Sequence, residues 1–122
     1  MMKQYAIFHK PNMTPISFFC TKEAAMERLL FITDCNIFGL FEVEVEIMRV
    51  LKDQFDYADY NLGTVCTIND CLLSIHPWRK TAYQHSEAIK SGLIEVCDVD
   101  YTYGKEIKRP KKEKEDDLND FS

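Results

Sequence analysis

A chain of 122 residues, 46% of them hydrophobic, is long enough for one domain with its own core. It holds no apolar run near the roughly 20 residues that span a bilayer, and its first residues lack a signal peptide's continuous apolar stretch. We therefore expect a cytoplasmic protein. The net charge of −5 argues against a dedicated duplex-DNA binder, which needs a basic surface.

The charges divide the chain into two parts. Residues 1–103 hold 9 basic and 14 acidic residues, whereas residues 104–122 hold 6 of each, with the basic ones first. Because the second part is charged and nearly free of apolar residues, it is not expected to pack. We predict a single globular α+β domain over 1–103 and a charged tail over 104–122, flexible or ordered by a partner.

The first elements predicted along the chain are a β-hairpin and a helix. Lys3–His9 alternates as a strand, two prolines bracket a turn, and Ile16–Cys20 returns as a second strand. Thr21 is a good N-cap for a helix over Lys22–Ile32, whose apolar stripe can cover a sheet.

The strongest pattern in the chain is the strand predicted at Leu40–Leu51. Large apolar residues alternate there with carboxylates, which is the period of a half-buried strand. The carboxylates are Glu42, Glu44 and Glu46. A solvated sheet face explains them, and so does an acidic surface that imitates the phosphates of nucleic acid.

The second half of the domain has weaker patterns. Lys52–Leu62 fits a short helix or an irregular loop equally well, and Thr64–Ile68 is predicted as a short strand. A short helix is expected through Ser74, a longer one over Trp78–Ser91 with Gly92 at its C-cap, and a last strand over 93–103. Together the elements predict an α+β fold: a mostly antiparallel sheet of four to five strands, two or three helices packed on one face, and a charged C-terminal tail.

The five cysteines are expected to be reduced, buried thiols that behave as small hydrophobic residues. Cys66, Cys71 and His76 recur at intervals of five, but structural zinc sites use shorter gaps and need a fourth ligand. No motif for nucleophilic catalysis or phosphate binding is present in the sequence. We therefore expect no metal and no cofactor, and we predict that the protein is not an enzyme.

The segment most typical of a binding surface is His76–His85, which combines two aromatic residues with two cations. This composition suits a protein–protein contact or the binding of phosphates and bases, and it also suits core anchors with solvated charges. A protein or protein complex of the host is the expected partner, with nucleic acid involved only indirectly. The predicted contact residues are Trp78, Arg79, Lys80 and Tyr83, with Glu42, Glu44 and Glu46 or the tail as a second contact.

The tail ends in an acidic segment that contains two large apolar residues, Leu118 and Phe121. Acids can steer such a segment to a basic groove, where the apolar side chains anchor it. The segment is similar to the acidic, aromatic-ended tails of single-stranded-DNA-binding proteins, which recruit partner proteins. This similarity implies an alternative function in binding single-stranded nucleic acid.

A compact hairpin followed by FFCTKEAAMERL and an acidic strand resembles small accessory proteins of tailed, T-even-like phages. Many of these bind and redirect host machinery such as RNA polymerase or defence nucleases. The resemblance implies a non-enzymatic host-takeover protein that modulates or inhibits a larger host assembly. A nucleic-acid mimic with an acidic sheet face is the other alternative.

Overall fold

The computed structural model describes residues 2–32, 36–76, 79–84 and 86–108. These residues form one six-stranded sheet in the order β2-β1-β3-β6-β4-β5, with every neighbouring pair antiparallel. The strands are β1 (Met2–His9), β2 (Thr14–Phe19), β3 (Phe38–Val50), β4 (Asn61–Cys66), β5 (Cys71–His76) and β6 (Ile94–Ile107). Three short helices accompany them: α1 (Lys22–Leu30), α2 (Arg79–Ala82) and α3 (Ser86–Lys90).

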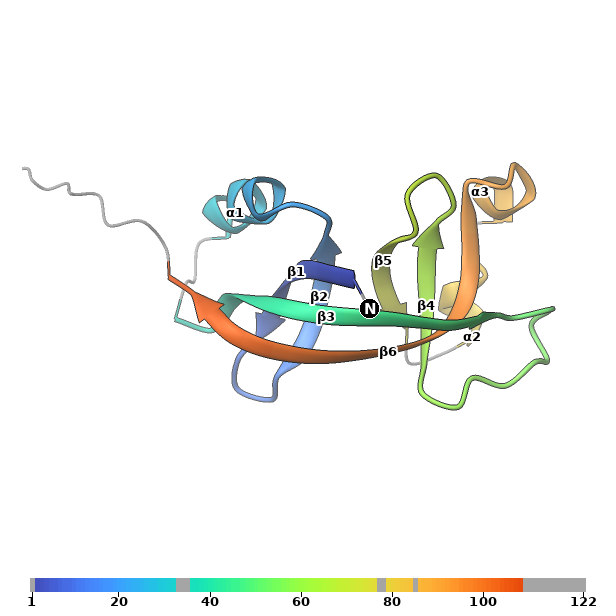
Figure 1. Ribbon diagram of the computed structural model, residues 1–122, viewed down its shortest axis with the longest axis horizontal. Coiled ribbons are helices and arrows are strands. Elements are labelled where there is room, and N and C mark those ends of the chain that lie inside the picture. Colours follow the sequence, from blue (N-terminus) through green and yellow to red (C-terminus); the bar gives the residue numbers. More distant parts are fainter. Residues whose placement is uncertain (1, 33–35, 77–78, 85, 109–122) are drawn as a thin grey trace, which may run out of the picture.

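The sheet is nearly closed and barrel-like. The long strands β3 and β6 run side by side along the molecule, with β1 and β2 at one end and β4 and β5 at the other (Figure 1). Irregularities in the register, such as the one between Thr64 and Val65, increase bending and twist. As a result the two edge strands, β2 and β5, come into contact.

The main core lies inside this barrel. Along β1 the alternation of side chains places Phe8 in the interior and Ile7 on the outer face, where Ala25 and Leu29 of α1 cover it. A smaller apolar cluster joins α2 to the ends of β3 and β6. The interior residues are Ala6, Phe8, Phe18, Phe41, Val43, Val45, Val65, Leu72, Cys97 and Val99.

The predicted α+β packing is wrong. Strands dominate the described structure, and the helices are short segments at its two ends instead of a layer over one sheet face. The short helix expected through Ser74 is strand β5, because Asp70 takes a φ of 56° in a turn that brings Cys71 back beside Cys66. The long helix expected after Trp78 gives two short ones, α2 and α3.

Local signals at the helix ends are confirmed. The Thr21 hydroxyl accepts a hydrogen bond from the backbone N–H of Ala24 at 3.2 Å, which caps α1. Gly92 follows α3 with a φ of 81°, a conformation that favours glycine. Strand β6 continues past the expected end of the last strand to Ile107, where it pairs with Leu40 of β3. No helix in the described part of the chain is long and apolar enough to cross a membrane.

Candidate partner-binding site

The loop between β3 and β4, residues 51–60, presents three large aromatic side chains to solvent. Phe55 is 75% exposed, Tyr57 74% and Tyr60 56%. A cluster of exposed aromatic side chains on one loop is typical of a surface that another molecule covers. We call residues 51–60 the aromatic loop.

Arg49, next to last in β3, fixes the middle of the aromatic loop. Its Nη1 donates to the Asp56 carboxylate at 2.8 Å, and its Nη2 donates to the carbonyl of Tyr57. The same carboxylate accepts the backbone N–H of Lys52 at 3.1 Å. These hydrogen bonds hold the pKa of the Asp56 carboxyl below its usual value, and the one from Arg49 has the largest effect.

Asp98 of β6 fixes the second half of the loop. Its side chain is buried, and its two oxygens accept the backbone N–H groups of Asp59 and Tyr60, each at 3.0 Å. Arg49 Nε lies 4.0 Å from Asp98 Oδ2, which adds an ionic contact to the buried carboxylate. The loop backbone is therefore tied to two strands of the barrel, and its aromatic side chains project from a fixed base.

A surface pocket of about 560 Å³ lies between the aromatic loop and α2. Phe55 and Gln54 line it from the loop, while Lys80, Tyr83 and Gln84 line it from α2 and the residues that follow. Tyr83 is half-buried, and its hydroxyl donates to the carbonyl of Asp53 at 2.9 Å. Tyr83 thus both lines the pocket and braces the loop.

The structure places only some of the predicted contact residues at this site. Lys80 is exposed and Tyr83 half-buried beside the loop, and Arg79 begins α2. Trp78, Leu118 and Phe121 lie outside the described residues. The aromatic residues of the loop were not among the contact residues predicted from the sequence. The available signal was that Asp53, Asp56 and Asp59 recur every three residues beside aromatic residues. This spacing fitted a short helix and an irregular loop equally well, so it did not indicate an exposed aromatic surface.

The predicted acidic face lies elsewhere, on β3 and β6. Glu42 is half-buried and lies 3.7 Å from Lys3 Nζ, whereas Glu44 and Glu46 are exposed. Glu46 stands directly opposite Asp100 of β6, and these acids line a small hollow of about 100 Å³. This face is separate from the residues that line the pocket beside the aromatic loop.

A second apolar hollow, of about 470 Å³, lies at the opposite end of the molecule between α1 and the end of β6. Met26, Leu30 and Ile107 contribute its apolar lining. Phe31, just after α1, is 77% exposed.

The candidate metal ligands do not form one cluster: Cys66 stands opposite Cys71 in the β4–β5 register, whereas His76 stands opposite Leu62 at the other end of the two strands. Cys71 is joined to Cys20 in a disulfide, and the ring Nε2 of His76 lies 2.8 Å from the hydroxyl of Ser74. Over the described ranges, no group of three or more His, Cys, Asp or Glu side chains could hold a metal ion.

Comparisons of the chain with protein-family models, with curated proteins and with solved structures found no match. The function proposed below therefore depends on the geometry and charge of the site.

Proposed function

We propose that this protein is a non-enzymatic binding factor that docks onto a partner protein through the aromatic loop and the adjoining pocket. The observation that carries the proposal is that the aromatic side chains of the loop are exposed while the loop backbone is held in place by hydrogen bonds. Phe55, Tyr57 and Tyr60 are exposed, while the backbone that carries them is bound to Arg49 and Asp98. A loop already held in one form loses less conformational entropy on binding, so more of the contact energy appears as affinity.

The charge around the aromatic loop favours a protein partner over nucleic acid. Asp53 and Asp59 are exposed in the loop, and residues 1–103 are acidic overall. Carboxylates beside the aromatic rings would repel a phosphate backbone. We infer a partner with apolar pockets for the rings and basic side chains around them, which the loop carboxylates would steer into place.

The resemblance to small phage accessory proteins adds a candidate partner class. RNA polymerase and defence nucleases are large bacterial assemblies with basic nucleic-acid channels, and an acidic protein with aromatic anchors is complementary to a surface of that kind. In this form of the proposal, docking through the aromatic loop modulates or inhibits the assembly.

The test is a pull-down from bacterial lysate with three forms of the full chain. These are the unaltered protein, the double variant Phe55→Ala/Tyr57→Ala, and the control Phe31→Ala. Phe31 matches Phe55 in residue type and exposure, but it directly follows α1, which lies at the end of the molecule opposite the β3–β4 loop (Figure 1). We expect one stoichiometric partner that the control retains and the double variant loses.

Once the partner is purified, titration calorimetry measures the loss. Truncating an interface aromatic at a hot spot costs about 2 kcal/mol or more, so each ring contributes roughly 30-fold in affinity. A partner that the double variant binds as well as the unaltered protein would refute the aromatic loop as the interface. Loss of binding in Phe31→Ala alone would place the interface at α1 instead.

A second candidate function is mimicry of nucleic acid by the acidic face. It is favoured by one observation, the like charges of Glu46 and Asp100 directly opposite each other in the sheet. Such pairs are unfavourable in a free sheet and are relieved when a basic partner covers them. If this reading holds, Glu44→Gln/Glu46→Gln weakens binding to the partner, whereas Phe55→Ala/Tyr57→Ala does not.

A further inference from the structure

The contact between the edge strands β2 and β5, which we call the seam, is the point where the barrel-like sheet closes. In the described strands no ladder of main-chain hydrogen bonds joins β2 to β5, which stand at opposite ends of the sheet order. Side-chain links cross here instead. They include the amide of Gln4, which contacts both the Phe19 carbonyl and Leu72, the contact of Asn69 with Cys20, and the Cys20–Cys71 disulfide.

The disulfide corrects the expectation that all the cysteines are reduced thiols. Cys20 directly follows β2 and Cys71 begins β5, with Cα atoms 6.1 Å apart at a sequence separation of 51. A bond between segments so distant in sequence restricts the unfolded chain strongly, and here it also ties the two edge strands together. It is therefore placed to control whether the seam stays closed.

The two cysteine residues differ in their exposure to solvent. Cys20 is exposed, whereas Cys71 is 3% exposed. Thiol–disulfide exchange requires an incoming thiolate to reach one sulfur in line with the bond that breaks. The structure therefore offers Cys20 as the sulfur that is attacked and Cys71 as the sulfur that leaves.

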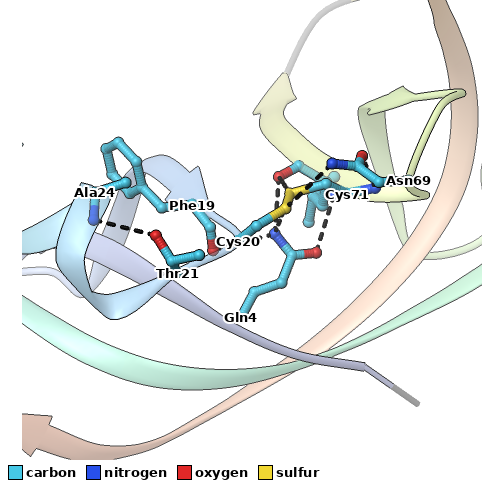
Figure 2. Close-up of a disulfide and its surroundings, with 8 residues drawn as sticks. Gln4, Phe19, Cys20, Thr21, Ala24, Asn69 and Cys71 are labelled. Carbon is cyan, nitrogen blue, oxygen red and sulfur yellow. Dashed lines mark hydrogen bonds between the residues drawn. A yellow bond between two sulfur atoms is a disulfide. The ribbon is translucent and has the colours of Figure 1, made fainter.

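Each sulfur also lies near an amide donor (Figure 2). Gln4 Nε2 lies 3.2 Å from Cys71 Sγ, and Asn69 Nδ2 lies 3.8 Å from Cys20 Sγ. Asn69 is itself held by the backbone N–H of Cys71, which donates to its Oδ1 at 3.1 Å. Donors aimed at sulfur stabilise the thiolate form, and a more stable thiolate leaves faster.

We propose that Cys20–Cys71 is a redox-active disulfide whose reduction by a dithiol opens the seam. A thiolate of the dithiol attacks Cys20 Sγ, the bond between the sulfurs breaks, and Cys71 leaves as a thiolate that accepts the Gln4 N–H. The second thiol of the reagent then attacks the mixed disulfide and releases Cys20. The protein gains two electrons and two protons, and the dithiol becomes a cyclic disulfide.

Reduction opens the seam without unfolding the barrel. The seam opens on the side of β2, which loses its covalent link to β5 when the sulfurs separate. The two hydrogen bonds of Gln4 to Leu72 keep β5 against β1, and the antiparallel ladders from β1 through β6 to β5 do not involve the disulfide. The residues that lose their covalent link are Cys20, which is exposed, and Cys71, the first residue of β5. We therefore expect a local change confined to β2, the β4–β5 turn and β5.

The test reduces the folded, full-length protein with dithiothreitol and then alkylates its thiols for peptide mass spectrometry. Hydrogen exchange is measured on the same samples. We expect reduction of Cys20–Cys71 at millimolar dithiol without denaturant, with unchanged circular dichroism and at least tenfold faster exchange in β2 and β5 but not in β3. Brief treatment with glutathione should leave its adduct on Cys20.

Two variants make the test specific. Cys66 stands opposite Cys71 in the β4–β5 register, so Cys20→Ser is combined with Cys66→Ser to prevent a new pair. This double variant should show fast seam exchange without any reductant, and Gln4→Met should slow reduction severalfold in a protein that keeps the disulfide. A disulfide that resists dithiol until the chain unfolds, an adduct on Cys71, or reduction that leaves exchange in β2 and β5 unchanged would each overturn the proposal.

Discussion

The side chain of Gln4 makes the two hydrogen bonds to Leu72 that a residue on a neighbouring strand would make. Its Nε2 donates to the Leu72 carbonyl at 3.0 Å, and the Leu72 N–H donates to its Oε1 at 2.9 Å. Gln4 is fully buried on β1, and Leu72 is fully buried on β5, which is not a neighbour of β1 in the sheet. One amide therefore satisfies backbone groups that would otherwise be unpaired inside the barrel.

Gln4→Met tests this closure. Methionine matches the length of glutamine but cannot replace its hydrogen bonds, so the N–H and carbonyl of Leu72 lose their partners. We expect the free energy of unfolding to fall by about 2–4 kcal/mol in urea denaturation. The control is Lys3→Met on the same strand, which removes one exposed ion pair and should change stability by less than about 0.5 kcal/mol. Equal effects of the two substitutions would contradict the role of Gln4.

Gly63 of β4 provides a second test of the closed interior. A Cβ at this position would lie 2.8 Å from Leu72 Cδ1 and 2.8 Å from Val99 Cγ2, both fully buried. Since a packed core resists added volume, we expect Gly63→Ala to destabilise the protein by about 1–3 kcal/mol. Gly104→Ala is the control, because the nearest atom to its Cβ is 3.8 Å away. The unfolding temperatures of the two variants are then compared. A larger drop in Gly63→Ala reports crowding of the core, whereas equal changes would report only the general effect of replacing glycine in a strand.

The sequence predicts the local structure of this protein better than it predicts the contacts that close the barrel. Alternation in β1 and β3 and the capping of α1 by Thr21 depend on neighbouring residues, so a single sequence carries them. The contacts that close the barrel join Gln4 to Leu72 and Cys20 to Cys71 across long stretches of chain. No local period marks these residues, and for that reason an open sheet covered by helices was predicted.

The candidate site shows the same division. Lys80 and Tyr83 stand out by composition, and they do line the pocket beside the aromatic loop. Arg49 and Asp98, which hold that loop, carry no motif. One is a basic and the other an acidic residue in strands that carry several charges, and the pair becomes recognisable only once Arg49 stands opposite Asp98 in the paired β3 and β6.

Acid should release the Arg49–Asp56 anchor of the aromatic loop. The hydrogen bond from Arg49 lowers the pKa of Asp56 below its ordinary value of 3.8, so folding favours the carboxylate. Its contribution is therefore fully present above about pH 4 and is lost as the pH falls through the lowered pKa. We expect the Asp56 carboxyl signal in NMR titration to move below pH 4, with the Tyr57 amide signal moving alongside it. In Asp56→Asn the Tyr57 signal should lose this acid transition, and a transition that persists there would have to come from another group.

Cys97 should resist chemistry that modifies Cys66. The side chain of Cys97 lies in the barrel interior, and this burial is the main reason that the pKa of its thiol is raised to about 11. Cys66, by contrast, is half-buried at the end of β4. At pH 8 only about one Cys97 thiol in a thousand is ionised, and the reagent must also reach the core, so iodoacetamide should label Cys66 at least tenfold faster. Peptide mass spectrometry of the unreduced, folded protein measures both rates, and labelling in denaturant supplies the reference in which the difference disappears. Equal rates in the folded state would mean that the interior opens on the labelling timescale, in which case the barrel is not closed as described.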